Sequence, residues 1–96
     1  MNEFRELFKT IENRASSKNK SSYTKKLLKS GKNIIAQKVG EESSELIIDF
    51  LKGTKKRTIE EAVDLIYHAF VMLHSKKINY NDIEKELKKR KNVRRK

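Results

Sequence analysis

Residues 32–52 read KNIIAQKVGEESSELIIDFLK, and residues 58–75 read TIEEAVDLIYHAFVMLHS; these two segments decide the fold. In both, apolar residues recur at spacings of three and four, which is the period of a helix. The first segment is followed by Gly53, a residue suited to the position after a helix. Thr58 and Glu61 have the spacing of a capping box, so we expect the second helix to begin at Thr58. The sequence therefore predicts two long helices joined by a short connection.

Shorter helical segments flank this pair. We predict a first helix from Asn2 to Ala15, a short helix from Tyr23 to Ser30 that Thr24 could cap, and a last helix opened by a capping box at Asn81–Glu84. The almost wholly basic tail from Lys88 to Lys96 is expected to be frayed or solvated. No strand-like alternation competes with these helical periods. The predicted fold class is all-α, a bundle of four to five helices.

The composition limits the size and class of the protein. A chain of 96 residues fits one domain, 1–96, with the tail at about 91–96. Without cysteine it can form neither a disulfide nor a cysteine-based zinc site. No apolar run is long enough for a signal peptide or a membrane span, so we expect a cytoplasmic protein with no membrane partner. The net charge of +11 favours a polyanionic partner, which could be nucleic acid, anionic lipid or a phosphorylated metabolite.

The acidic residues are clustered in spite of this basic background. Seven of the thirteen acids fall within residues 41–64. They are Glu41, Glu42, Glu45, Asp49, Glu60, Glu61 and Asp64. Those of the first long helix share a narrow sector with Lys38, beside an apolar face. The second long helix is apolar nearly all round, which is typical of a buried helix. Its acid Asp64 is flanked by apolar residues and therefore needs a partner.

A divalent cation held between the two helices would supply that partner. Mg²⁺ prefers oxygen ligands and keeps positions open for substrate phosphates. Four carboxylates from adjacent helices, at Glu42, Glu45, Glu61 and Asp64, form a suitable cradle in a helical bundle. Each acid taken alone also has a simpler explanation, because exposed glutamates are common on helices and Glu61 could serve the capping box. His68 on the same helix is interpreted as a hydrogen-bonded histidine at a helix interface.

Two motifs resemble a known family. The segment Ser22-Tyr-Thr-Lys-Lys-Leu-Leu, then Gly31, then Ile35-Ala-Gln-Lys-Val-Gly-Glu-Glu42 is similar to phosphoribosyl-ATP pyrophosphatases, as is Glu60-Glu-Ala-Val-Asp-Leu-Ile-Tyr-His68. The resemblance covers about residues 3–90. That family belongs with the all-α nucleoside triphosphate pyrophosphohydrolases, whose shared pattern is ExxE followed by ExxD. Ser43, where the family usually has alanine, and Ser21, where glycine is common, depart from its motifs without removing a ligand.

The resemblance implies a function and an assembly. It implies Mg²⁺ as cofactor, cleavage of phosphoribosyl-ATP to phosphoribosyl-AMP and pyrophosphate, and a helical homodimer with a shared bundle. Many relatives are fused to the cyclohydrolase of the next step, and we expect this chain to act without that domain. The family also places the segment with Tyr23, Thr24 and Lys26 near the substrate.

Two further residues of the first long helix, Lys38 and Glu41, are assigned roles because they share its acidic sector. Lys38, one turn before Glu42, can reach a phosphate oxygen. Glu41 is assigned as an additional ligand or as the base that orients water. Spacing does not identify which carboxylate activates the water.

Two rival functions remain open. An all-α pyrophosphatase acting on another nucleotide, such as dUTP or a damaged dNTP, would need the same four acids. A basic helical module that binds nucleic acid would explain the charge and the tail, but not the acids on the two most apolar helices, and it would require exposed aromatic residues among the basic ones. We therefore expect no nucleic-acid partner.

Overall fold

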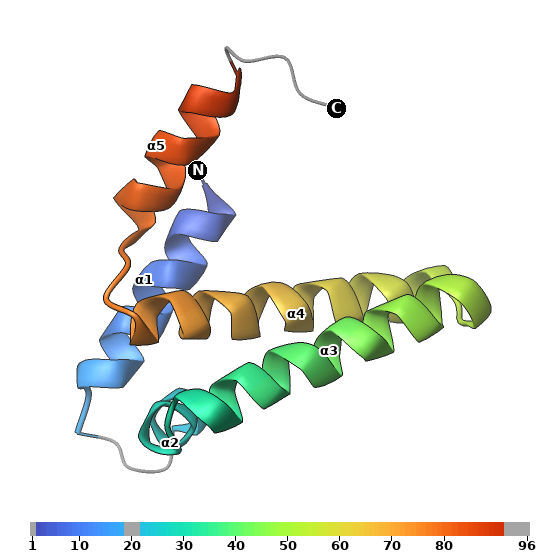
Figure 1. Cartoon of the computed structure of the whole chain (residues 1–96), viewed down its shortest axis with the longest axis horizontal. Coiled ribbons are helices and arrows are strands. Elements are labelled where there is room, and N and C mark those ends of the chain that lie inside the picture. Colours follow the sequence, from blue (N-terminus) through green and yellow to red (C-terminus); the bar gives the residue numbers. More distant parts are fainter. Residues whose placement is uncertain (1, 19–21, 92–96) are drawn as a thin grey trace.

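The computed structural model describes residues 2–18 and 22–91, and every regular element in them is a helix. The helices are α1 (Glu3–Ser16), α2 (Tyr23–Lys29), α3 (Lys32–Lys52), α4 (Lys55–Ser75) and α5 (Tyr80–Lys91). The long helices α3 and α4 lie side by side as an antiparallel hairpin, while α1 and α5 extend away from one end of it (Figure 1). The predicted all-α class is confirmed. No helix in the described residues is long and apolar enough to cross a membrane.

The predicted capping box at Thr58 is wrong, because α4 begins one turn earlier. Its N-cap is Thr54, whose side chain accepts a hydrogen bond from the backbone N–H of Arg57. The Thr58 hydroxyl instead lies 3.1 Å from the carbonyl oxygen of Asp49, so it can satisfy a carbonyl at the end of α3. Glu61 is therefore free of the capping role that its spacing suggested.

The helices α2 and α3 begin at the predicted Tyr23 and Lys32, whereas the cap of α2 and the start of α5 differ from the prediction. Ser22, rather than Thr24, caps α2. Asn79 and Asp82 exchange side-chain-to-backbone hydrogen bonds of 3.1 Å across the start of α5, so the box opens two residues before the predicted Asn81. Because α5 continues to Lys91, the start of the basic tail is helical and solvent-exposed. Residues 92–96 of the predicted tail lie outside the described residues.

The core lies where the first four helices meet, at one end of the hairpin. Each of these helices contributes one buried apolar residue to the central cluster. They are Ile11, Leu27, Ile35 and Val71. A second contact joins α5 to the body, since the ring of Phe8 packs 5.2 Å from Phe70 and 5.9 Å from Tyr80 between centroids. The hairpin is thus anchored at this end.

The opposite end of the hairpin exposes many apolar side chains. Large hydrophobic residues of both helices are exposed there: Ile47, Ile48, Phe50, Leu51, Ile59 and Val63. Within a single chain, therefore, α4 is not buried all round. This apolar surface is not covered by any other part of the described chain.

Candidate metal centre

Three carboxylates from the two long helices converge. Oxygens of Glu42 and Glu45 on α3 and of Glu61 on α4 lie within 4.8 Å of one another. Glu61 is only 3% exposed, and its Oε1 atom is buried without a hydrogen-bond partner in the described structure. A buried carboxylate oxygen without a partner is costly. Since oxygen ligands at this separation suit Mg²⁺, the residues present fit the cation that the family pattern implies.

The electrostatics of the cluster follow from this crowding. Burial raises the pKa of Glu42, and the negative charge of Glu45 acts in the same direction. The negative charge of Glu61 is the main cause that raises the pKa of Glu45. Like charges held close together disfavour ionisation, and a bound cation would reverse that effect. The cluster therefore has the electrostatic character of a cation site.

Arg57 partly balances the negative charge, and the sequence analysis missed it. Its Nη2 lies 2.6 Å from Oε2 of Glu61, its Nη1 lies 2.6 Å from Oε1 of Glu60, and Nη2 is 3.9 Å from Oδ2 of Asp49. The arginine thus engages Oε2 of Glu61, while Oε1 has no hydrogen-bond partner in the described structure. The i, i+4 spacing of Arg57 and Glu61 was a usable signal, because such pairs are neighbours on a helix.

Asp64 is exposed, whereas the sequence predicted a carboxylate among buried apolar residues. Its side chain is exposed, so the acid that is buried on α4 is Glu61 rather than Asp64. Asp64 is not one of the three converging residues, although its charge contributes to raising the pKa of Glu42. It lies at the edge of the cluster, and its role as a fourth ligand stays a prediction.

Lys38 and Glu41 form a pair beside the cluster. Their charged groups are 3.5 Å apart, and Gln37 donates a hydrogen bond of 3.0 Å to Glu41. That hydrogen bond and the lysine lower the pKa of Glu41. The Tyr23 hydroxyl, which is negative when ionised, is the largest cause that raises the pKa of Lys38, followed among the raising effects by Glu41. The ammonium of Lys38 therefore lies near both α2 and the acidic cluster.

The predicted substrate residues of α2 have different surroundings. Tyr23 is half-exposed, and its hydroxyl lies 3.0 Å from Nε2 of His68. Thr24 is 1% exposed and hydrogen-bonded to the hydroxyl of Tyr67, so in this structure it anchors α2 to α4. Lys26 is exposed. The structure thus joins Tyr23 to His68 on α4, and it brings Thr24 into the interior.

The chain is similar to known proteins over most of its length. The chain matches the phosphoribosyl-ATP pyrophosphohydrolase family over residues 4–91. Phosphoribosyl-ATP pyrophosphatase of Sulfurisphaera tokodaii is 45% identical over 84 residues, covering 88% of this chain and 89% of that protein. The Bacillus cytotoxicus protein of the same name is 44% identical over 84 residues, covering 88% and 78%.

A longer relative has the same similarity over part of its length. The histidine biosynthesis bifunctional protein HisIE of Staphylococcus aureus is 42% identical over 84 residues. The matched region is 88% of this chain but 40% of that protein. The match to the family covers nearly the whole of the described structure, including all three converging carboxylates. The chain belongs to the phosphoribosyl-ATP pyrophosphohydrolase family.

Proposed function

We propose that this chain hydrolyses phosphoribosyl-ATP to phosphoribosyl-AMP and pyrophosphate with Mg²⁺, the second step of histidine biosynthesis. The observation that carries the proposal is the convergence of carboxylate oxygens of Glu42, Glu45 and Glu61, a residue whose Oε1 is buried without a partner in the described structure, in a chain of this family. Two relatives that are 44% and 45% identical are named phosphoribosyl-ATP pyrophosphatase.

The same residues define the proposed metal ligands. Glu42, Glu45 and Glu61 would hold Mg²⁺, and Asp64 at the edge of the cluster would be the fourth ligand. When bound, the cation neutralises charge on the phosphates. Arg57 engages Oε2 of Glu61, and Oε1 has no hydrogen-bond partner in the described structure.

The neighbouring residues would act on the substrate and water. Water would attack the α-phosphorus, the P–O bond that joins it to the β-phosphate would break, and pyrophosphate would leave with the electrons of that bond. We assign Glu41 to orienting the water and accepting its proton, and Lys38 to a phosphate oxygen. Tyr23 and Lys26 on α2 would contact the substrate. Positioning and charge neutralisation supply most of the catalysis in such reactions.

A substrate panel tests this proposal. We expect pyrophosphate release from phosphoribosyl-ATP that depends on added Mg²⁺ and exceeds release from ATP, dUTP and other common triphosphates. Asp64→Asn should abolish turnover while circular dichroism shows an unchanged helical content, because the side chain is exposed. Preference for an ordinary triphosphate, or near-normal Mg²⁺-dependent activity of Asp64→Asn, would contradict the respective assignment.

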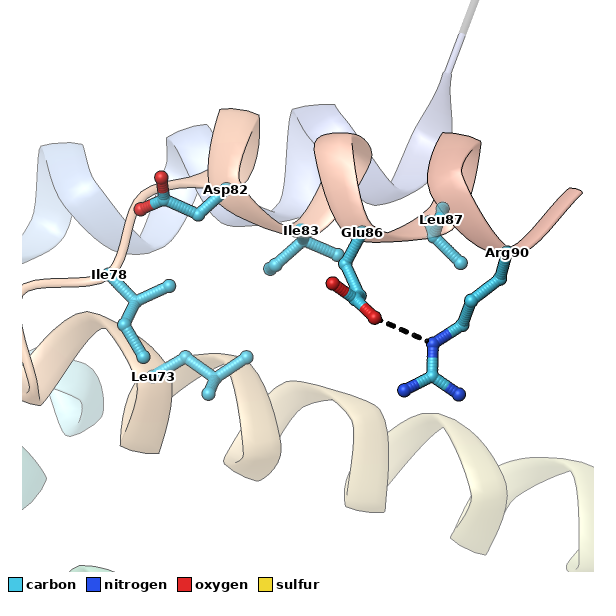
Figure 2. Close-up of a pocket in the computed structure, with 7 residues that line it drawn as sticks. All are labelled: Leu73, Ile78, Asp82, Ile83, Glu86, Leu87 and Arg90. Atoms are coloured by element: carbon cyan, nitrogen blue, oxygen red, sulfur yellow. Dashed lines mark hydrogen bonds and ion pairs between the residues drawn. The ribbon is translucent and has the colours of Figure 1, made fainter. Parts of the chain in front are cut away.

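We also propose that the chain acts as a homodimer. The far end of the α3–α4 hairpin exposes six large apolar residues, and an open apolar groove of about 430 Å³ lies between the end of α4 and α5 (Figure 2). The groove is lined mainly by aliphatic side chains, among them Leu73, Ile78, Ile83 and Leu87. Exposed apolar surface of this extent favours association.

Sedimentation of the active protein tests the assembly. We expect a dimer at micromolar concentration and a shift towards monomer in Phe50→Lys, whose parent side chain is 74% exposed. A folded, active monomer of the unmodified chain would contradict the proposal. We place the reaction in the cytoplasm, where fractionation of the source cells should recover the activity.

A further inference from the structure

His68 links the metal-binding helix to the helix that carries the proposed substrate residues. It lies on α4, is 7% exposed, and uses both ring nitrogens. Nδ1 is 2.8 Å from the backbone carbonyl oxygen of Asp64, and Nε2 is 3.0 Å from the hydroxyl of Tyr23 on α2. A carbonyl can only accept, so Nδ1 carries a hydrogen and donates it. In the neutral ring Nε2 is then the acceptor, and Tyr23 donates its hydroxyl hydrogen to it.

The surroundings hold this pair in one orientation. The ring of Tyr67 stacks on Tyr23 at 6.2 Å and meets the ring of His68 edge-on at 5.0 Å, measured between centroids. The hydroxyl of Tyr67 is in turn hydrogen-bonded to the buried Thr24. Tyr23 itself is half-exposed and therefore reachable from solvent. Its hydroxyl is oriented by the buried His68.

We propose that His68 is a positioning residue, which orients the Tyr23 hydroxyl and thereby fixes α2 against the metal-binding turn of α4 for substrate binding. The role at the substrate rests on the proposed function, whereas the hydrogen bond itself does not. His68 touches Asp64 through the backbone and Tyr23 through the side chain, so it acts through these residues and not on the substrate.

Two simpler roles would produce different results. His68 could only fill space between the helices, or it could act only through its electrostatic effect on Glu42. Neither role requires the Tyr23 hydroxyl. Three variants separate these possibilities: Tyr23→Phe removes the donor, His68→Leu removes the acceptor, and His68→Gln supplies a carbonyl acceptor near the place of Nε2.

The first measurement detects the hydrogen bond between Tyr23 and His68 and does not depend on enzymatic activity. The chain has three tyrosines and no tryptophan, so labelling tyrosine Cζ with ¹³C gives three NMR signals, and Tyr23→Phe identifies that of Tyr23. We expect His68→Leu to shift the Tyr23 signal and His68→Gln to restore most of the original position. Tyr80, which packs on Phe8, serves as the internal control. An unchanged Tyr23 signal in His68→Leu would overturn the proposal.

The second measurement tests whether this hydrogen bond contributes to substrate binding. Loss of one hydrogen bond should raise KM for phosphoribosyl-ATP by roughly three- to tenfold, with a smaller change in kcat. Tyr23→Phe, His68→Leu and the double variant should show the same increase, because residues that act through one contact are not additive. Increases that multiply in the double variant would mean that His68 acts independently of Tyr23, and the proposal would be wrong.

The NMR and kinetic measurements together also distinguish a failure of this proposal from a failure of the proposed function. If the unmodified protein hydrolyses no phosphoribosyl-ATP, the proposed function fails, and the substrate role of His68 fails with it, while the NMR result still establishes or refutes the hydrogen bond. If His68→Leu does not fold, the comparison of Tyr23→Phe with His68→Gln remains, because Tyr23 is half-exposed and Gln keeps a polar group in place. In that comparison, a KM unchanged in Tyr23→Phe would overturn the proposal.

Discussion

Glu61 has one carboxylate oxygen paired with Arg57 and the other buried without a partner in the described structure. The adjacent Glu60 is exposed and pairs with the same arginine, yet it lies outside the three converging carboxylates. We therefore expect Glu61→Gln to weaken Mn²⁺ or Mg²⁺ binding by at least about tenfold, as even outer-shell changes do at metal sites, while Glu60→Gln changes it little. Calorimetry or the EPR signal of free Mn²⁺ measures this. Equal effects of the two variants would remove Glu61 from the ligand set.

The contributions of Glu45 and Glu41 to the stability of the fold should depend on pH in opposite directions. The pKa of Glu45 is raised above its ordinary value, chiefly by Glu61, so its contribution to stability is complete below pH 4.5 and is lost as pH rises through the raised pKa. Glu45→Gln should therefore gain stability over the unmodified chain at pH 7, in EDTA, and lose this gain at pH 4. The pKa of Glu41 is lowered, so Glu41→Gln should lose stability at pH 7, and this loss should vanish in acid. Urea unfolding at the two pH values checks both signs.

At the scale of the helices, the turn between α3 and α4 is tightly packed. A Cβ atom at Gly53 would lie 2.7 Å from Oδ1 and 3.0 Å from the backbone carbonyl oxygen of Asp49. Because the backbone cannot move away without disturbing the end of α3, Gly53→Ala should destabilise the protein by about 1–3 kcal/mol. Lys52→Ala, at the preceding exposed position, is the control and should change stability by less than about 0.5 kcal/mol. Thermal unfolding compares them; an equal Tm for both variants would contradict the packing argument.

The helices were predictable from the sequence, whereas several of their boundaries were not. Apolar periodicity is a property of a whole segment, so both long helices were found. Thr54 and Thr58 are both plausible caps, and the choice depends on the tertiary contact between Thr58 and the end of α3. The pattern placed the acids on two facing helices, but which acid is buried depends on how the helices are rotated against each other. That rotation buries Glu61 and exposes Asp64.

At the scale of the whole molecule, the single chain is extended and incompletely packed. Its radius of gyration is 14.8 Å, whereas a compact domain of this length has about 12–13 Å. The sequence of α4 is apolar nearly all round, and the structure places exposed apolar residues of this helix at the end of the hairpin that has no core. At Gly40, inside α3, an added Cβ atom would meet no atom of the described structure within 4 Å. Apolar periodicity shows which residues are apolar, but not whether they pack within the chain or against a second copy. The uncovered surface could therefore not be located from the sequence.

The net charge of +11 permits a test that separates a nucleotide hydrolase from a nucleic-acid binder. If the cations serve a small polyphosphate, the important one is Lys38, which lies beside the acidic cluster. Deleting residues 91–96 removes four cations and should leave turnover close to intact. Lys38→Ala should lose a direct phosphate contact and lower kcat/KM by roughly ten- to a hundredfold.

Both proteins should be assayed across a salt series, because long-range attraction fades as the Debye length falls below about 10 Å above 0.1 M salt. The loss in Lys38→Ala should persist at high salt, since a contact within the site is screened less than attraction at a distance. For a nucleic-acid binder, tail deletion would instead flatten the salt dependence of affinity for RNA or DNA, because fewer counterions are released. Tight nucleic-acid binding that disappears with the tail, together with no hydrolysis of any nucleotide by the unmodified chain, would refute the enzymatic function.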